Sequence, residues 1–324
     1  MQQLLQQTQS YTLLKTEGAE GRLSHAYLLH FADAENLRLA LKEFAKILLD
    51  CDTSATLSQK RRANLIDEEN FSDCLFFPKG DKKLTVEDAE LIKEESLLNP
   101  VEGDKKLFVV FDFAEANQQT QNKLLKLLEE PPTGVFFLLG TTSIFPVLQT
   151  VLSRTNRLEI PPFTTEQITA CLRRIYGNKF EEETLSLCAS CANGRVGQAQ
   201  NLLEGGWYKI LLEQAFVLTR TPAFKLPQVI KTVGETKYKR ELLSLLRLIF
   251  RDALLLKTQG NRANGRLLLR AQREQIEELA KEYAITALIY AQEGISEAEK
   301  QVNFNAVFSQ CIEILIAKIR EKNI

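Results

Sequence analysis

Residues 122–132 read NKLLKLLEEPP, and residues 135–139, just beyond them, read VFFLL. The leucines at 124, 125, 127 and 128 fall on one helical stripe, and the two prolines stop that helix at once. A continuous apolar run follows after only Thr133 and Gly134. The stretch therefore predicts an amphipathic helix joined by a tight turn to a strand. We expect its leucines to pack into the core first, with partner contacts left to any exposed face.

The chain alternates between short apolar runs and helical patterns up to about residue 160. The runs at 26–29 and 107–111 are apolar throughout, which is typical of strands covered on both faces. A pattern rich in Leu and Ala at about 35–50 predicts a helix between them. Strands that alternate with helices predict a parallel α/β sheet.

Two breaks divide the remaining sequence. Pro161-Pro162-Phe163 marks the end of the alternating part, and Gly205-Gly206 closes a small helical segment that begins near Thr165. From Trp207 onward the pattern is helical, with long Leu and Ile stripes. We therefore expect an α/β domain over 1–161, a small helical domain over 162–206 and an all-α domain over 207–324.

Composition and charge exclude several classes of protein. The 324 residues are 44% hydrophobic and 26% charged, and no apolar run approaches the roughly 18 residues that span a bilayer. Residues 1–5 lack the basic segment of a signal peptide, so we expect a cytoplasmic protein without a membrane partner. Residues 1–160 carry 18 basic and 24 acidic side chains (−6), and residues 161–324 carry 23 and 18 (+5). The acidic first half is unsuited to binding a phosphate backbone. The mild basic excess of the second half predicts a solvated surface rather than a nucleic-acid groove.

The six cysteines are expected to be free thiols, because a cytosolic chain rarely forms disulfides. Cys188 and Cys191 form a C-x-x-C motif, yet no second pair follows at zinc-ribbon spacing. Their neighbours are small helix-forming residues, which favours buried thiols over metal or redox chemistry.

Four motifs follow one another in a fixed order after residue 107. They are a strand that leads to Asp112, the helix closed by 129–132, a strand that leads to Gly140-Thr141-Thr142, and Leu152-Ser153-Arg154. This series resembles the AAA+ subunits of sliding-clamp loaders. In that family a Walker B strand, a helix of the form L-L-K-x-L-E-E-P-P, a polar sensor and a Ser-Arg-Cys triplet follow in the same order. Thr155 replaces the cysteine here.

The resemblance also includes residues 22–28, which are similar to the first strand of that domain. It is dense over 22–30 and 107–162, and past 206 it rests on helical character and length alone. It implies an AAA+ domain of the P-loop NTPase type, a helical lid and an all-α collar that mediates oligomerisation.

The expected ATP site departs from the family pattern in three places. After the first strand the chain reads His30-Phe31-Ala32-Asp33-Ala34-Glu35-Asn36, without the G-x-x-x-x-G-K-[ST] motif whose amides and lysine hold phosphates. Phe113 follows Asp112 where active members have a glutamate. The second sensor arginine falls on Gly197. We therefore expect no ATP binding, no hydrolysis and no cofactor, and we expect Asp112 to be held by local hydrogen bonds only.

An AAA+ domain without its own ATP site, but with a Ser-Arg triplet, resembles the delta-prime family of bacterial DNA polymerase III. The resemblance implies a non-catalytic stator that helps to load the sliding clamp onto primed DNA, with the tau/gamma ATPase and delta subunits as partners. Polymerase activity would belong to the complex. Arg154 is implied as an arginine finger that acts in trans on the neighbouring subunit's ATP.

Alternatives remain for Arg154 and for the chain. Arg154 would otherwise be a surface arginine paired with a nearby carboxylate, and Arg157 is a second candidate by proximity. The chain would otherwise be an AAA+ ATPase with a divergent phosphate loop, or the delta subunit that opens the clamp. Delta is expected to lack both the Ser-Arg triplet and the L-E-E-P-P helix.

Two further expectations concern metal and histidine. Many relatives carry four cysteines in an insertion after the first helix, at spacings that suit zinc. Residues 51–80 hold only Cys51 and Cys74, and no histidine, so we expect no zinc module. His25 is expected to pack or to form a hydrogen bond at the start of the first strand.

Overall fold

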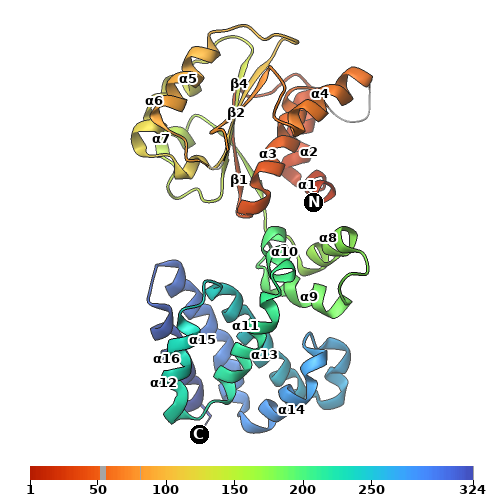
Figure 1. Cartoon of the computed structure of the whole chain (residues 1–324), viewed down its shortest axis with the longest axis vertical. Helices are drawn as coiled ribbons and strands as arrows, with labels where there is room; N and C mark the ends of the chain where they lie inside the picture. The colour runs from red at the N-terminus through yellow and green to blue at the C-terminus, as the bar shows by residue number, and fades with distance from the viewer. Residues whose placement is uncertain (52–55, 81, 324) are drawn as a thin grey trace. The chain divides into compact units, whose positions relative to one another are not determined.

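A computed structural model describes residues 1–51, 56–80 and 82–323. The chain divides into two compact units, Met1–Pro162 and Phe163–Ile324 (Figure 1), which are described separately below. Among the described residues, no helix is both long enough and apolar enough to cross a membrane.

The first unit is built on a five-stranded sheet whose paired strands all run parallel. In spatial order the strands are β2 (Cys74–Phe77), β3 (Lys106–Val110), β4 (Val135–Thr141), β1 (Ala26–Phe31) and β5 (Asn156–Ile160). The three strands predicted from apolar runs are the three central ones. Every residue of β3 is buried, as expected for a strand covered on both faces. The predicted parallel α/β sheet is therefore confirmed.

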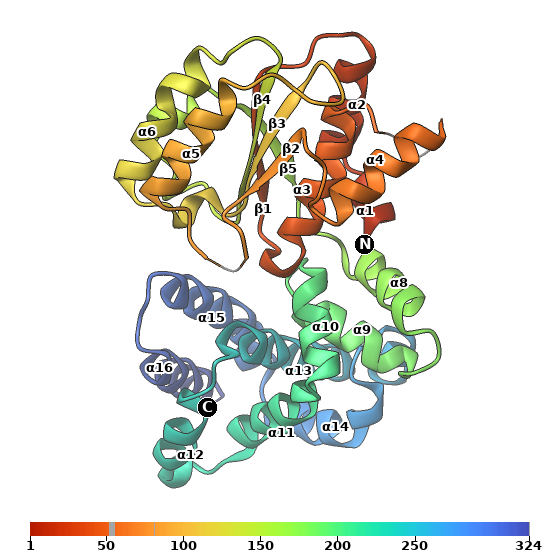
Figure 2. The ribbon, with the colours of Figure 1, turned by 45° about the horizontal axis from the view of Figure 1, so that its top comes forward.

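Helices cover both faces of this sheet (Figures 1 and 2). One face carries α1 (Gln2–Gln6), α2 (Gln9–Ala19), α3 (Ala34–Leu48) and α4 (Leu57–Asp67), and the other carries α5 (Val86–Ser96), the 3₁₀ turn η1 (Phe113–Glu115), α6 (Gln118–Glu129) and α7 (Gln149–Leu152). The leucine stripe of α6 packs inward as predicted. Leu124 and Leu128 are buried in the core, and Leu125 and Leu127 are partly buried against it.

The central helix α3 lies close to the sheet because β4 has a glycine beneath it. A Cβ on Gly140 would come within 2.6 Å of the Cδ1 atom of Leu41. A larger residue at 140 would force the side chain of Leu41, in the middle of α3, to shift.

The edge of the sheet contains elements that the apolar pattern did not predict. β2 has only four residues, and β5 alternates exposed and buried side chains as an edge strand does. The hydroxyl of Ser10 on α2 donates to the carbonyl of Glu159 at 2.6 Å and accepts from the Glu159 N–H at 3.0 Å. These bonds attach α2 to the free edge of β5.

The second unit is helical, as expected. Its helices are α8 (Thr165–Tyr176), α9 (Glu182–Cys191), α10 (Val196–Glu204), α11 (Trp207–Arg220), α12 (Leu226–Gly234), α13 (Lys239–Gln259), α14 (Arg273–Glu282), α15 (Ile285–Asn303) and α16 (Phe308–Glu321), with 3₁₀ turns η2 (Ala223–Lys225), η3 (Gly260–Arg266) and η4 (Arg270–Gln272). A capping box between Thr164 and Gln167 starts α8 where the sequence predicts a helix. The division of this unit into a lid at 162–206 and a collar at 207–324 stays a prediction.

Candidate functional site

The connection between β1 and α3 occupies the place of a phosphate loop. The strand ends at Phe31 and the helix begins at Ala34, so only Ala32 and Asp33 lie between them. The eight-residue phosphate motif needs a wide loop whose successive N–H groups surround an anion. A two-residue connection offers no such loop.

The side chain at this helix start is itself a carboxyl group. Asp33 is fully buried at the N-cap of α3, and its Oδ2 accepts a hydrogen bond from the side-chain amide of Asn36 at 2.9 Å. The first turn of a helix attracts negative charge through its free N–H groups. A buried carboxylate at this position would repel a phosphate from the same helix end.

Asp112 lies two residues beyond β3 and is bound by Thr142, the residue that follows β4. Its carboxylate accepts hydrogen bonds from the Thr142 hydroxyl at 3.1 Å and the Thr142 N–H at 3.3 Å. The backbone of Asp112 is left-handed, with φ 37° and ψ 66°. Burial raises the pKa of this carboxyl, although both Thr142 bonds oppose the shift. The expectation that local hydrogen bonds hold Asp112 is confirmed.

Phe113, the residue after Asp112, points into the core. Its side chain is fully buried in the cluster that includes Phe137 and Leu139. A glutamate here would bring a charge into that apolar cluster, at a large desolvation cost. The position that holds a glutamate in active members of the resembled family thus serves packing in this chain.

Arg154 lies just beyond α7 and is held by residues of its own unit. Its Nε and Nη2 both donate to Oε2 of Glu129, at 3.1 and 3.0 Å, and its Nη1 donates to the carbonyl of Thr150 at 3.0 Å. The side chain of Arg154 is 30% exposed and that of Glu129 is 56% exposed. An ion pair of this kind was the alternative interpretation of Arg154, and the structure contains it. The pair leaves part of the guanidinium open to solvent.

The two partners are positioned by the ends of two short elements. α6 ends at Glu129, one residue before the double proline, and the four-residue α7 ends two residues before Arg154. The buried side chain of Gln121 fixes the loop before α7, because its Nε2 donates to the carbonyl of Pro146 at 3.2 Å and its Oε1 accepts from the Leu148 N–H at 3.0 Å. Residue 154 therefore follows a loop that is anchored to α6.

Two other residues that the sequence singled out lie near this region. A ring nitrogen of His25 is 2.8 Å from the carbonyl oxygen of Leu128, at the end of α6, so the expected hydrogen bond at the strand start is confirmed. Arg157 lies on the edge strand β5 with an exposed side chain. The structure thus gives Arg154 an ordered environment next to the L-E-E-P-P motif.

The cysteines show no arrangement for chemistry. All six are free, as predicted, and all are buried, which was predicted for Cys188 and Cys191. Burial raises the pKa of Cys188 to about 12 and holds that of Cys191 well above its usual value, so both stay protonated thiols at neutral pH. Within residues 1–51, 56–80 and 82–323, no group of three or more His, Cys, Asp or Glu side chains could hold a metal ion. Residues 52–55, inside the expected insertion, lie outside the described residues.

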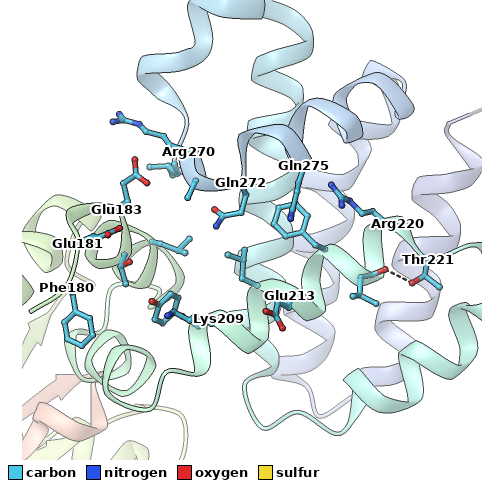
Figure 3. Close-up of a pocket in the computed structure, with 18 of the residues that line it drawn as sticks. Phe180, Glu181, Glu183, Lys209, Glu213, Arg220, Thr221, Arg270, Gln272 and Gln275 are labelled. Atoms are coloured by element: carbon cyan, nitrogen blue, oxygen red, sulfur yellow. Dashed lines mark hydrogen bonds between the residues drawn. The ribbon is translucent and has the colours of Figure 1, made fainter.

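The second unit contains a cavity of about 1080 Å³ between α9, α11 and residues 268–275 (Figure 3). Both signs of charge line it, from Glu181, Glu183, Glu213, Lys209, Arg220 and Arg270. Two of its cations are already engaged, because Arg220 pairs with Glu278 at 3.0 Å and Arg270 donates to the carbonyl of Leu267 at 3.2 Å. The residues that line the cavity therefore do not favour either an anionic or a cationic ligand.

The contact between Glu129 and Arg154 is the feature that sequence reasoning missed. Both residues belong to recognised motifs, but 25 positions separate them and no spacing rule joins a helix end to a loop. The available signal was indirect. The double proline ends α6 abruptly and leaves an exposed carboxylate at its last residue.

Comparisons with known proteins agree with the order of motifs. Residues 6–164 match the family described as DNA polymerase III, delta subunit. The gamma subunit of DNA polymerase III from Buchnera aphidicola subsp. Schizaphis graminum is 29% identical over 189 residues, which are 57% of this chain and 52% of that protein. The tau subunit from Escherichia coli K12 is 28% identical over 190 residues, 57% of this chain and 29% of that protein. The chain thus spans about half or less of the length of these relatives.

A solved structure of a gamma subunit-related protein from Thermotoga maritima aligns with 96% of this chain and 99% of its own, at 16% identity and a TM-score of 0.42. The fold class itself is evident in the first unit. Its parallel five-stranded sheet, followed by a helical second unit, confirms the expected parallel α/β domain followed by helices.

Proposed function

We propose, since residues 6–164 match the delta subunit family of DNA polymerase III, that this chain is the delta-prime stator of a clamp loader. In this role it helps to load the sliding clamp onto primed DNA without catalysing a reaction itself. Its partners are the tau/gamma ATPase subunit and the delta subunit, and it reaches the clamp and DNA through the complex. We place the assembly in the bacterial cytoplasm.

The absence of an intrinsic ATP site is supported by the start of α3. Two residues connect β1 to α3, and Asp33 is buried at the helix end that would otherwise attract phosphate. Phe113 supplies core packing instead of a carboxylate that could orient water. The short connection, the buried Asp33 and the apolar Phe113 all oppose nucleotide binding or hydrolysis. We therefore infer a subunit whose AAA+ domain acts through contacts of its surface with other subunits.

The single observation that carries the proposal is the position of Arg154. It follows the sensor strand, is partly exposed and is ordered by Glu129 and Thr150. Phosphoryl transfer spreads charge over the γ-phosphate oxygens, which a guanidinium supplied across an interface can stabilise. We propose that Arg154 is this finger, directed at the ATP of the neighbouring tau/gamma subunit.

Two other functions compete with this one. The delta subunit is favoured by the description of the matching family, but the retained Ser153-Arg154 and L-E-E-P-P motifs oppose it. An ATPase with a divergent phosphate loop predicts nucleotide binding by the isolated chain. Calorimetric titration with ATP and Mg²⁺ separates this case, because our proposal expects no saturable heat at millimolar nucleotide. A one-to-one isotherm in the micromolar range would establish an ATP site.

The finger is tested with Arg154→Ala in a reconstituted complex whose only intact ATP site is the one beside this chain. Arginine fingers contribute on the order of 10³- to 10⁵-fold in rate, so single-turnover hydrolysis should fall by about that factor. Removing a half-exposed ion pair should cost about 0–1 kcal/mol of stability, so assembly on a sizing column should persist. Arg157→Ala tests the second candidate and should leave hydrolysis unchanged. Unchanged hydrolysis in the Arg154 variant, or a parallel loss of assembly, contradicts the assignment.

A further inference from the structure

Two aromatic rings lie against each other at the surface of the second unit, at the beginnings of two helices. Trp207 is the first residue of α11 and Tyr238 is the N-cap of α13. Their ring centroids lie 5.5 Å apart, with an interplanar angle of 41°. The backbone of Gly205 makes room for the indole, since a Cβ there would come within 2.3 Å of its Cδ1 atom.

One lysine lies over both rings. The Nζ of Lys237 is 5.3 Å from the ring centroid of Trp207 and 5.1 Å from that of Tyr238. The lysine is exposed and Trp207 is 37% exposed, so solvent reaches both the ammonium and the indole. An ammonium held over two π faces can be displaced by a flat ring that stacks in its place.

Further positive charge follows directly in the chain. Lys239 and Arg240 are both exposed in the first turn of α13. Positive charge at a helix start opposes the helix dipole, so these two side chains weaken the helix rather than stabilise it. Residues that weaken a helix without improving its packing are often kept for a function.

The carboxylates around these residues leave the cluster with a positive balance. Glu241 pairs with Arg195 at 3.4 Å, and Glu204 accepts a hydrogen bond from the hydroxyl of Tyr176 at 2.6 Å. Glu235 is exposed and offsets one charge. Together, Lys237, Lys239 and Arg240 outnumber Glu204 and Glu235.

We propose that Trp207, Lys237, Tyr238, Lys239 and Arg240, here called the aromatic–basic patch, bind single-stranded nucleic acid. An unpaired base stacks on the Trp207–Tyr238 pair, and the three cations contact the flanking phosphates. Aromatic platforms beside lysines and arginines are the usual means by which proteins hold single strands without reading sequence. The proposal does not depend on the stator function, because it concerns a separate surface and a ligand that the isolated chain can bind.

The chemistry favours single strands over duplexes. Stacking needs a base that is not already stacked within a helix, whereas phosphates alone are available in both forms. The ligand can be single-stranded DNA or RNA, because no contact of the five side chains with a ribose 2′-hydroxyl is part of the proposal.

The experiment uses the fact that Trp207 is the only tryptophan in the chain. The full chain is titrated with dT20 and, separately, with rU20 while tryptophan emission is recorded. We expect saturable quenching with a dissociation constant of about 10–100 μM at low salt. About three phosphate contacts predict a slope near −2 when log affinity is plotted against log salt concentration. A 20-base-pair duplex and inorganic tripolyphosphate should quench much less.

Variants then separate stacking from charge. Tyr238→Ala and the pair Lys239→Gln with Arg240→Gln should each weaken dT20 binding about tenfold, with the melting temperature as a check on folding. Trp207→Ala is followed by anisotropy of labelled dT20 and should weaken binding similarly. The matched control is Lys225→Gln, which removes another lysine 5.6 Å from an exposed ring, that of Phe224, and should change nothing.

Three outcomes overturn the proposal. The first is no quenching up to 500 μM dT20, roughly five times the weaker expected constant. The second is equal quenching by duplex or tripolyphosphate, which would show a general anion effect. The third is unchanged dT20 affinity in both Tyr238→Ala and Trp207→Ala. If only dT20 or only rU20 binds, the patch is restricted to that nucleic acid and the proposal stands for it.

Discussion

Oε2 of Glu129 accepts hydrogen bonds from both Nε and Nη2 of Arg154, at 3.1 and 3.0 Å. With Nη1 bound to the carbonyl of Thr150, all three guanidinium nitrogens have a partner within the chain. The arginine is therefore oriented before any neighbour is present. Orientation before binding removes an entropy cost from a transition-state contact.

This geometry predicts a measurable effect of Glu129 on the neighbouring ATP site. Glu129→Ala should lower single-turnover hydrolysis there by about tenfold, less than the loss from Arg154→Ala, because the guanidinium remains but is no longer held. The apparent KM for ATP should change little, since nucleotide is bound by the other subunit. Glu130→Ala is the matched control, with an exposed glutamate one position further on. Equal effects of the Glu129 and Glu130 variants would remove the orienting role.

Asp112 provides a test of the proposal that this chain has no working nucleotide site. Burial raises the pKa of its carboxyl, so the ionised form is disfavoured in the folded state. Asp112→Asn keeps an acceptor for Thr142, suits the left-handed backbone and removes the charge. We expect stability to be unchanged or higher by up to about 1 kcal/mol, and clamp loading to be unaffected. Asp112→Ala, which removes the acceptor, should melt lower than Asp112→Asn. A loss of clamp loading in the Asn variant would indicate a metal-binding role.

The sequence predicted those parts of the fold that depend on long apolar patterns. β1, β3 and β4 are continuous apolar runs, and α6 has a leucine stripe that ends at two prolines. β2 has four residues and β5 is half exposed, so neither gives a run that stands out. The helices before β1 are fixed by tertiary contacts such as that between Ser10 and Glu159.

The candidate sites were less predictable because they depend on contacts between distant residues. The motifs identified Arg154, but they did not show that Glu129 binds it across the gap between α6 and α7. Likewise, the overall charge of the second half did not show that Lys237 lies over both Trp207 and Tyr238. Periodicity reports which side of an element is buried, whereas such pairs arise only when the elements pack.

Zinc content tests the expectation that no metal module is present. Burial raises the pKa of both Cys51 and Cys74, which disfavours the thiolates that zinc requires. Protein purified and treated with chelator should contain less than about 0.1 zinc per chain, and its melting temperature should not change, because no fold energy comes from the metal. A chain that retains one zinc through chelation, with a lower melting temperature once the metal is stripped, would contradict this expectation.

Acid should weaken the first unit through Glu69, which follows α4 and binds two cations of α3. Arg38 donates to it at 2.6 and 2.5 Å, and Lys42 lies 2.9 Å away. The Arg38 hydrogen bonds lower the pKa of Glu69 from 4.5 to about 2. Burial opposes this shift, and the hydrogen bond from Lys42 adds to it. Because the folded pKa is the lower one, the stabilisation is complete above about pH 4.5 and disappears as pH falls towards about 2.

Glu69→Gln should therefore lower the free energy of unfolding by about 2–3 kcal/mol at pH 7. The loss should be much smaller near pH 2.5, where the Glu69 carboxyl of the unfolded native chain is protonated. Unfolding in urea, followed by circular dichroism at pH 7, 4 and 2.5, measures the difference between variant and native chain. Glu68→Gln is the matched control, because that neighbouring side chain is exposed. A difference that stays constant across the three pH values would mean that Glu69 stabilises the protein by packing and not by its charge.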